Sequence, residues 1–342
     1  MTTTESAAPS PALTVRGLTV DYRRRGVGGV GGRTLRAVDD LSFDLIPGRV
    51  LALVGESGSG KSTVVRTLAG FVAPSGGEIA LDSLRGVHGG RRTAQTYRRA
   101  LQTVFQDPFA SLNPMHTVER HLARPLARQR GIRGRERLRA AVHELLGLVN
   151  LTPAADFAAK HPHELSGGQR QRVAIARALA TEPRVLLADE PVSMLDVSIR
   201  LEILNLLDGL TRQRNLALLY VTHDLATARH FSENIMVMYR GRVVESGPAD
   251  EVILNPAHPY TQMLATAAPD PTVPREQLAA ARRARVEARA NRDMSVPVES
   301  PGACNFIARC PYAKAVCVTA PDAFPAGEGH TARCWRLTEH YA

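Results

Sequence analysis

The residues best suited to chemistry form a glycine-rich run that ends in a lysine and a serine. Residues 55–62 read GESGSGKS, which is the G-x-x-x-x-G-K-[ST] pattern of a phosphate-binding loop. The glycines let backbone N–H groups turn inward around an anion, while Lys61 would reach the β- and γ-phosphates and the Ser62 hydroxyl would ligate Mg²⁺. A glycine-rich structural turn is the alternative. The residues expected to bind a nucleotide here are Gly55, Glu56, Ser57, Gly58, Ser59, Gly60, Lys61, Ser62 and Thr63.

Two adjacent carboxylates follow the apolar run at 185–188. A buried strand of this kind would deliver Asp189 to Mg²⁺ or to the water shell around it. Glu190, one residue further on, could then polarise an attacking water as a general base. The alternative is that both are surface carboxylates at the end of a strand, an interpretation that the phosphate loop upstream disfavours.

A third motif, LSGGQ at residues 165–169, stands at the start of a helix expected over Gln169–Ala180. Ser166 offers a hydroxyl, Gly167 and Gly168 permit close approach of the backbone, and the helix presents its positive end to a phosphate group. A simple N-cap by Ser166 is compatible with these residues. It does not explain both glycines.

Together these motifs resemble those of ATP-binding-cassette (ABC) ATPases, and the resemblance covers roughly residues 13–250. It implies that the LSGGQ signature closes over the nucleotide held by a second ABC ATPase subunit, identical or paralogous. Each hydrolytic site would then be shared between two chains, and the protein would be an ATPase that works as a dimer. The signature residues expected to face the partner's nucleotide are Leu165, Ser166, Gly167, Gly168 and Gln169.

The resemblance also implies roles for single residues. Tyr22 matches the aromatic residue that stacks on adenine, and Gln106 matches the glutamine that touches Mg²⁺ and the attacking water. His223 matches the switch histidine at the γ-phosphate; its simpler interpretation, like that of Tyr22, is a structural residue at a strand end. Asp196 lies in the dimer-contacting loop, where Met194 replaces the usual alanine. The catalytic residues implied are Lys61, Gln106, Glu190 and His223, and the Mg²⁺ ligands are Ser62, Gln106 and Asp189.

The elements that must position these groups follow from hydrophobic patterning. Continuous apolar runs followed by helix-favouring sequence are typical of buried parallel strands in an α/β sheet, and they occur at 50–54, 185–188 and 216–221. Alternating sequence at 13–20 and 35–45, around a Gly/Arg-rich loop, predicts an antiparallel hairpin. We therefore predict an α/β protein of the P-loop NTPase (ABC ATPase) class. It should have a RecA-like parallel sheet core, an antiparallel β subdomain, an inserted helical subdomain and a small C-terminal extension that contains the cysteines.

The expected domains follow changes in sequence texture. Residues 1–11 read as a disordered leader, and 12–250 as the ABC ATP-binding domain, with a helical subdomain at about 107–180 that Pro125 and Pro153 should interrupt. Residues 251–342 form a proline-punctuated C-terminal extension with a basic, alanine-rich helical stretch at 277–292.

All four cysteines lie in this extension, at Cys304, Cys310, Cys317 and Cys334, with the spacing C-x5-C-x6-C-x16-C. Disulfides are disfavoured in a reducing compartment. Four thiolates suit a [4Fe–4S] cluster or a tetrahedral zinc ion. The absence of paired C-x-x-C knuckles favours iron–sulfur; zinc and unligated cysteines remain alternatives. Either centre would be structural, because the segment is too small for a core of its own.

Two further stretches are more particular than the ABC motifs. Residues 106–114 (QDPFASLNP) and 255–261 (NPAHPYT) resemble the ATPase subunits of oligopeptide, dipeptide and nickel importers, whose tails carry the same cysteine pattern. The resemblance predicts transport of peptides, with nickel or another small solute as the alternative cargo. His258-Pro259-Tyr260 carries no catalytic assignment, and a proline-stiffened connection would account for it.

Charge and hydropathy bear on where in the cell the protein should be found and on what it should bind. The formal charge is +10, but the chain holds only three lysines against 40 arginines, which indicates compositional bias and solvated surface arginine more than a nucleic-acid patch. No apolar run approaches the roughly 20 residues that span a bilayer, and the first residues lack a signal-peptide core. Together with the resemblance to importer ATPases, this implies a peripheral protein on the cytoplasmic face of the inner membrane, attached through permease subunits.

The expected partners are a second ATPase subunit, two transmembrane permease subunits and, indirectly, an extracytoplasmic solute-binding protein, with no nucleic acid. A soluble ABC ATPase of repair or translation is the competing class. It is disfavoured because the chain carries neither a long coiled-coil insertion nor a second cassette. A low-activity member of a heterodimeric pair is a third hypothesis, but every motif residue is intact.

Overall fold

The computed structural model describes residues 10–24, 33–82, 84–85, 91–267 and 302–341, with four isolated positions at 276, 280, 283 and 287. The leader expected over 1–11 lies outside these residues except for its last two. Most of the Gly/Arg-rich hairpin loop and of the basic stretch at 277–292 also lie outside them.

The main sheet has eight strands in the order β11-β12-β10-β9-β3-β8-β7-β6. Five neighbouring strands, from β9 to β6 at one edge of the sheet, are parallel, and β10 pairs antiparallel with β9. This confirms the parallel α/β core. The strands that share the parallel pairing are β3 (Val50–Val54), β6 (Leu101–Val104), β7 (Val185–Asp189), β8 (Ala217–Thr222) and β9 (Asn234–Tyr239), and β10 spans Arg242–Pro248.

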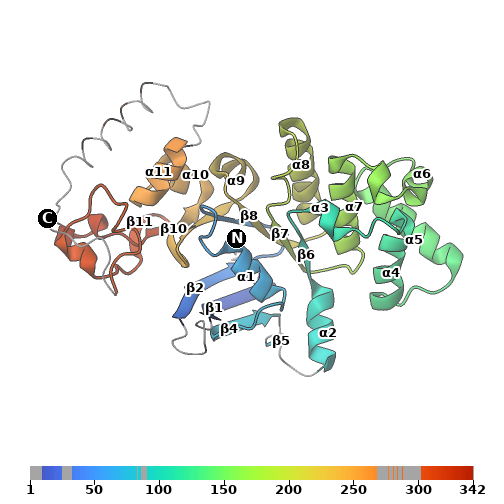
Figure 1. The fold of residues 1–342 in the computed structure, drawn as a ribbon, viewed down its shortest axis with the longest axis horizontal. Helices are drawn as coiled ribbons and strands as arrows, with labels where there is room; N and C mark the ends of the chain where they lie inside the picture. Colours follow the sequence, from blue (N-terminus) through green and yellow to red (C-terminus); the bar gives the residue numbers. More distant parts are fainter. Residues whose placement is uncertain are drawn as a thin grey trace, which may run out of the picture.

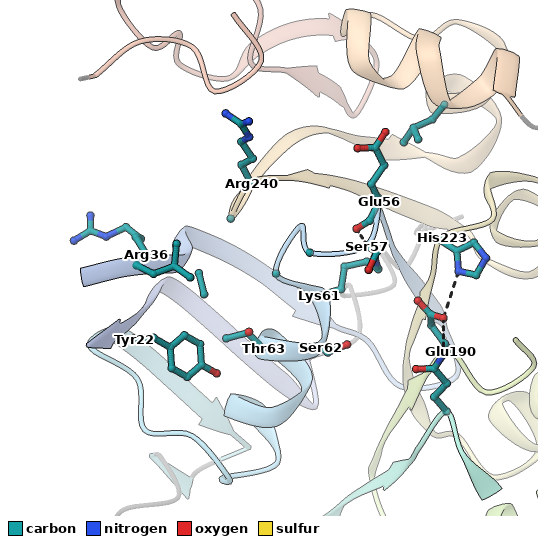
Figure 2. Close-up of a pocket in the computed structure, with 17 residues that line it drawn as sticks. Tyr22, Arg36, Glu56, Ser57, Lys61, Ser62, Thr63, Glu190, His223 and Arg240 are labelled. Atoms are coloured by element: carbon teal, nitrogen blue, oxygen red, sulfur yellow. Dashed lines mark hydrogen bonds and ion pairs between the residues drawn. The ribbon is translucent and has the colours of Figure 1, made fainter. Parts of the chain in front are cut away.

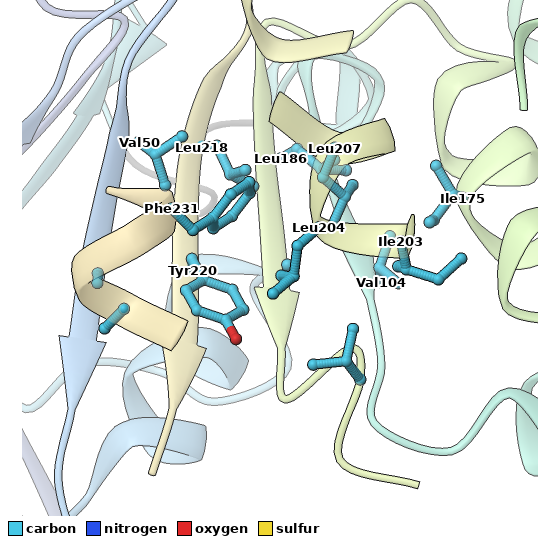
Figure 3. Packing of buried hydrophobic residues seen from close by; sticks show 14 of the residues in the cluster. Val50, Val104, Ile175, Leu186, Ile203, Leu204, Leu207, Leu218, Tyr220 and Phe231 are labelled. Carbon is cyan, nitrogen blue, oxygen red and sulfur yellow. The ribbon is translucent and has the colours of Figure 1, made fainter. Parts of the chain in front are cut away.

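Strands β3, β7 and β8 are almost entirely apolar because both of their faces are covered. Leu186 and Leu218 point to one face, where they pack against α8 (Val197–Gln213) and α9 (Leu225–Phe231), as Figure 3 shows. On that face Tyr220 makes an edge-on contact with Phe231, with ring centroids 4.9 Å apart. The next residue along each strand belongs to a separate cluster on the opposite face.

That second cluster joins the main sheet to a four-stranded antiparallel sheet of order β2-β1-β4-β5. Its strands are β1 (Leu13–Arg24), β2 (Arg33–Leu45), β4 (Gly76–Leu81) and β5 (Leu84–Arg85). The cluster also takes in α1 (Lys61–Leu68) and the buried Tyr97 of α2 (Arg91–Ala100). The antiparallel β subdomain is therefore confirmed, and it flanks α1 (Figure 1).

A set of helices is inserted between the adjacent strands β6 and β7 (Figure 1). These are α3 (Pro108–Ser111), α4 (Val118–Gln129), α5 (Arg135–Leu148), α6 (Ala154–Ala159), the 3-10 turn η2 (Pro162–Glu164) and α7 (Gly167–Leu179). These helices lie between residues 108 and 179. The expected interruption at Pro125 is wrong: Pro125 lies inside α4. Its missing N–H costs about 3 kcal/mol, which burial of Val118, Leu122 and Leu126 along the same helix offsets.

The C-terminal extension is part of the main sheet and not only an appendage. Strand β12 (His330–Ala332) pairs antiparallel with β10, and β11 (Phe324–Gly327) pairs with β12. The boundary expected after residue 250 falls inside α10 (Ala249–Leu254), which α11 (Pro259–Ala267) follows. The short 3-10 turns η3 (Ala315–Val318), η4 (Trp335–Leu337) and η5 (Glu339–Tyr341) complete the described extension. Across the described residues, no helix has the length and apolar character needed to cross a bilayer.

Candidate functional site

The phosphate loop connects β3 to α1, as its motif predicts. Gly60 has φ +111°, and a Cβ built on it would lie 2.4 Å from the carbonyl oxygen of Ala37, so only glycine fits. The Lys61 ammonium group folds back over the loop and donates to the backbone oxygens of Gly55, at 2.6 Å, and Glu56, at 3.0 Å. Burial lowers the pKa of Lys61. The loop thus carries an ammonium group that a polyphosphate could draw away from backbone carbonyls.

The two carboxylates stand where β7 ends, beside this loop. The Ser62 hydroxyl donates to Oδ1 of Asp189 at 3.3 Å, although 127 positions separate the two residues. Burial raises the pKa of Asp189. A hydroxyl and a carboxylate oxygen that meet in this way form the all-oxygen donor set that Mg²⁺ prefers.

The Glu190 carboxylate contacts two side chains, and all three residues follow the ends of strands in the main sheet. Its Oε2 accepts a hydrogen bond from Nε2 of Gln106, at 3.3 Å, and lies 3.3 Å from Nδ1 of His223 (Figure 2). The three residues follow β7, β6 and β8, whose carboxyl ends meet at one edge of the parallel sheet. Glu190 itself has φ +47°, an uncommon conformation for a residue with a side chain. This constellation can hold and deprotonate a water molecule.

One open cavity of about 1160 Å³ connects these groups. Tyr22 and His223 lie on opposite sides of Lys61, so the cavity runs from an aromatic ring, across the phosphate loop, to the carboxylate (Figure 2). Thr63 also lines it, and Arg36 and Arg240 add positive charge. Its size and its polarity suit a nucleoside triphosphate.

The signature motif is built as a helix cap within the chain. The Ser166 hydroxyl accepts from the backbone N–H of Gln169, at 3.3 Å, and the Gln169 side chain accepts in return from the N–H of Ser166. A Cβ on Gly168 would lie 2.7 Å from Cγ2 of Ile199. Close packing against Ile199 therefore also explains why a glycine occupies this position. Among the described residues, Leu165–Gln169 and Asp196 do not line the nucleotide cavity. Most of the phosphate-loop residues and the expected catalytic residues therefore line one cavity, and the signature motif lies outside it.

Sequence reasoning missed a set of contacts between the phosphate loop and the C-terminal extension. The Arg309 guanidinium group pairs with both carboxylate oxygens of Glu56, at 2.7 and 2.9 Å, and this pairing lowers the pKa of Glu56. The Tyr260 hydroxyl accepts the backbone N–H of Glu56, at 2.9 Å. No signal in the sequence links these positions, since Arg309 lies 253 residues beyond Glu56.

The four cysteines come together in the folded extension. Cys304, Cys310, Cys317 and Cys334 line one small cavity with His258, and all four are free thiols. Burial raises the pKa of Cys310 to about 12 and that of Cys334 to about 11. Within the part of the chain that the structure describes, no three His, Cys, Asp or Glu side chains are placed to hold a metal ion as they stand.

The fold and the nucleotide cavity together define an ATPase of the ABC class. Comparison with known families agrees: the family described as ABC transporter matches residues 38–193, and the oligopeptide/dipeptide transporter C-terminal region matches residues 244–317. The chain belongs to the ABC transporter ATP-binding proteins of the oligopeptide/dipeptide transport family. It is accordingly an ABC ATPase, and ATP with Mg²⁺ is the typical nucleotide of that class.

Individual relatives cover most of the chain. The Di/tripeptide transport ATP-binding protein DppF of Pseudomonas aeruginosa is 41% identical over 312 residues, which are 89% of this chain and 91% of that protein. The Oligopeptide transport ATP-binding protein OppF of Bacillus subtilis is 45% identical over 240 residues, 70% of this chain and 78% of that protein.

Solved structures show the same fold. The post-hydrolysis dimer of the ATP-binding cassette MJ0796, bound to ADP and Pi, matches with a TM-score of 0.60 and 30% identity, over 69% of this chain and 98% of that one. The cbiO1 protein of Clostridium perfringens, part of the ABC transporter complex cbiONQ, matches with a TM-score of 0.62 and 29% identity, over 71% of this chain and 91% of that one.

Proposed function

We propose that this chain is the ATP-hydrolysing subunit of an importer for di- or oligopeptides, held at the cytoplasmic face of the inner membrane by two permease subunits. The observation that carries the hydrolytic function is the convergence of Gln106, Glu190 and His223 beside the phosphate loop. The peptide cargo is supported by the relatives, which are di/tripeptide and oligopeptide transport ATP-binding proteins, and by the matching C-terminal region. Nickel or another small solute is the alternative cargo.

In this proposal the nucleotide lies along the cavity. Adenine stacks on Tyr22, and the phosphates rest on the N–H groups of the loop, with Lys61 at the β- and γ-phosphates. Ser62, Asp189 and Gln106 would hold Mg²⁺, which neutralises charge on the phosphates. The hydrogen bond between Ser62 and Asp189 supports this assignment because it already brings two of the three ligands together.

Glu190 is the proposed general base. As a water oxygen bonds to the γ-phosphorus, the bond from phosphorus to the bridging β–γ oxygen breaks, ADP leaves with that oxygen, and Glu190 takes the water's proton. Gln106 and His223 fix the carboxylate from both sides, so its orientation is set before the nucleotide arrives. His223 would also contact the γ-phosphate.

The proposed working unit is a dimer in which Leu165–Gln169 of one subunit covers the nucleotide of the other, with Asp196 at the contact. The separation of the signature from the cavity within one chain supports this arrangement. Exposed apolar side chains beside the Asp196 loop support it as well, namely Met194, Val197 and Leu201. The similar cassette MJ0796 forms a dimer in its structure with ADP and Pi.

For the cysteine tail we propose a [4Fe–4S] cluster held by Cys304, Cys310, Cys317 and Cys334, with zinc as the alternative. The donor set suits such a centre: the four thiols line one cavity, three of them buried and Cys304 partly buried, and thiols of this kind bind metals as thiolates. The centre would supply structural cross-linking of a loop-rich segment. Iron content and a visible absorption band on anaerobically purified protein test this proposal, and stoichiometric zinc without iron would contradict it.

Reconstitution tests the whole function. The subunit, assembled with its permeases in proteoliposomes, should hydrolyse ATP faster when a peptide-loaded binding protein is present. Stimulation by duplex DNA, with no membrane subunits co-purifying, would instead favour a nucleic-acid ATPase. Stimulation by loaded nickel but not by peptides would move the cargo to the alternative solute.

A further inference from the structure

The phosphate loop is held from outside the ATP-binding core at its second residue, Glu56. Its carboxylate forms the two-bond pair with Arg309, and its backbone N–H is bound by the Tyr260 hydroxyl. Both partners belong to the C-terminal extension, one on α11 and one between two cysteines. In Figure 2 the side chain of Glu56 points away from the catalytic carboxylate and toward the helix and loops of that extension.

Arg309 is tied to the cysteines by a short, tightly bonded segment. Cys304 and Cys310 bracket Phe306 and Arg309, and the backbone N–H groups of Arg309 and Cys310 both donate to the carbonyl oxygen of Phe306. The N–H of Cys304 donates to the carbonyl oxygen of Cys317. Whatever fixes the cysteines therefore fixes the position from which Arg309 reaches the loop.

Tyr260 reaches the same cysteines through His258. The His258 ring lies in the cysteine cavity and is held because its Nδ1 accepts the backbone N–H of Tyr260, at 3.0 Å. Buried Glu245 accepts the N–H of His258, at 2.8 Å, and also binds His330. Phe306 packs against His258 and Tyr260, with ring centroids 5.6 Å away in both cases. One continuous set of contacts thus runs from the cysteine cavity to Glu56.

We propose that Tyr260 and Arg309 are positioning residues that hold the phosphate loop ready for ATP, and that the four-cysteine centre acts on nucleotide affinity through them. The inference rests on the proposed function of the loop. Because the N–H of Glu56 is engaged by Tyr260, it is not free to turn toward a phosphate, and the entry to the loop has one conformation. Fixing that entry before binding lowers the ordering cost of binding.

The two contacts differ in strength. Arg309 and Glu56 are both partly exposed, so solvent weakens the ion pair, although its two-bond geometry makes it stronger than a pair with a single bond. Tyr260 is fully buried. Its hydroxyl satisfies a backbone donor that would otherwise lack a protein partner, and the loss of one such bond typically changes an equilibrium about 3- to 10-fold. The hydrogen bond from Glu56 to Tyr260 should therefore stabilise the loop more than the ion pair with Arg309 does.

The first test measures nucleotide affinity separately from turnover. Tyr260→Phe and Arg309→Ala should each weaken equilibrium binding of a fluorescent ATP analogue, by about 3- to 10-fold for Tyr260→Phe, and raise KM while kcat in the assembled transporter stays nearly constant. The matched control is Arg333→Ala, which breaks an ion pair between the extension and Asp40. Unchanged affinity in both test variants would overturn the proposal.

The second test asks whether the cysteine centre acts through this connection. Nucleotide affinity is compared before and after Cys310→Ser, in the wild type and in the Tyr260→Phe/Arg309→Ala double variant. Binding should weaken in the wild type and change much less in the double variant, since the two changes break one chain of contacts. Equal weakening in both backgrounds would overturn the coupling.

If Cys310→Ser fails to fold, the same comparison is made with anaerobically purified protein stripped of its metal by a chelator. Wild-type protein that binds no MgATP would instead count against the proposed function itself. The two failures are thus distinguishable.

Discussion

The phosphate loop and the signature helix stand in opposite situations within one chain. Around the loop, side chains from the main sheet, the β subdomain and the C-terminal extension face one cavity. At the signature, the hydroxyl and the backbone N–H of exposed Ser166 bond Gln169 in the capping box, and the glycines pack on Leu195 and Ile199 of the same chain. The phosphate loop thus lies in a cavity that can bind a ligand, whereas the signature motif is exposed on the surface, where a partner could contact it.

This difference indicates how the two motifs divide the work. The loop holds its residues in place before binding, because Glu56 is fixed from outside and Glu190 is fixed by Gln106 and His223. The signature needs only a well-formed helix end that points outward. Binding of ATP should therefore depend on residues of the same chain, whereas hydrolysis should depend on residues of two chains.

The largest effect is expected from Glu190→Gln. Loss of a general base should lower turnover by about 10²- to 10⁴-fold, while ATP binding persists and closed dimers accumulate. Phosphate release and size-exclusion chromatography with MgATP measure both results. The matched control is Glu182→Gln, in the turn that precedes β7, whose carboxylate pairs with Arg130. Normal turnover in Glu190→Gln would remove Glu190 from the role of base.

Ser166→Arg should affect turnover almost as strongly. A bulky side chain at the signature would block its approach to the partner's γ-phosphate, so turnover should fall by roughly 10²- to 10³-fold, the typical effect of losing one transition-state contact. Affinity for ATP should stay unchanged, because the cavity of the same chain does not include Ser166.

Mixing the two variants sharpens this result. In a mixed dimer, the Ser166→Arg subunit provides an intact Glu190 and the Glu190→Gln subunit provides an intact signature. One complete site forms, and ATP hydrolysis should return. Mixtures that stay inactive would mean that the signature does not act in the partner's site.

Asp189→Asn, a change beside the phosphate loop, should raise the concentration of Mg²⁺ that ATP hydrolysis requires. Removal of one carboxylate from the proposed ligand set should raise the Mg²⁺ concentration for half-maximal activity by about 10- to 100-fold, as typically found when metal-site residues change. Titration of ATPase activity with Mg²⁺ at saturating ATP measures the shift. Ser166→Arg, assayed through its residual activity, should leave the Mg²⁺ titration unaltered.

The smallest expected effect depends on pH. Pairing with Arg309 lowers the pKa of Glu56, so the stabilisation is fully present above the unfolded-state value and is lost as the pH falls through the lowered folded-state value. The Tm difference between wild type and Arg309→Ala should therefore be constant above about pH 5 and shrink under more acidic conditions. Because the pair is partly exposed, we expect about 0.2–1 kcal/mol. A difference that grows on acidification would contradict the pairing.

The sequence predicted the central strands and the nucleotide residues because both leave local signals. The run VLALV before the loop and the run VLLAD before Glu190 are buried on both faces, so every residue in them is apolar up to the functional carboxylate. Strand β6, by contrast, carries Gln102 and Thr103 at partly exposed positions and was missed. Strands β11 and β12 are too short to show a period.

Long-range contacts could not be predicted from spacing. The contacts of Glu56 with Tyr260 and Arg309 join residues 204 and 253 positions apart, and they form where α11 and the cysteine segment lie against the phosphate loop. The segment His258-Pro259-Tyr260 carried no functional assignment in the sequence, although its tyrosine touches the phosphate loop directly. The continuous α4 is a similar case, since burial of its apolar face outweighs the local effect of Pro125.

The way in which the main sheet ends has a consequence for solubility. Without β12, the outer side of β10 would present free N–H and C=O groups along an extended strand, a template for aggregation. The tail closes that side, and the new rim is β11, a four-residue strand that contains Pro325. A proline there removes one of the few donors that a foreign strand could use. The tail thus covers a strand edge that could otherwise pair with other copies of the chain and cause aggregation.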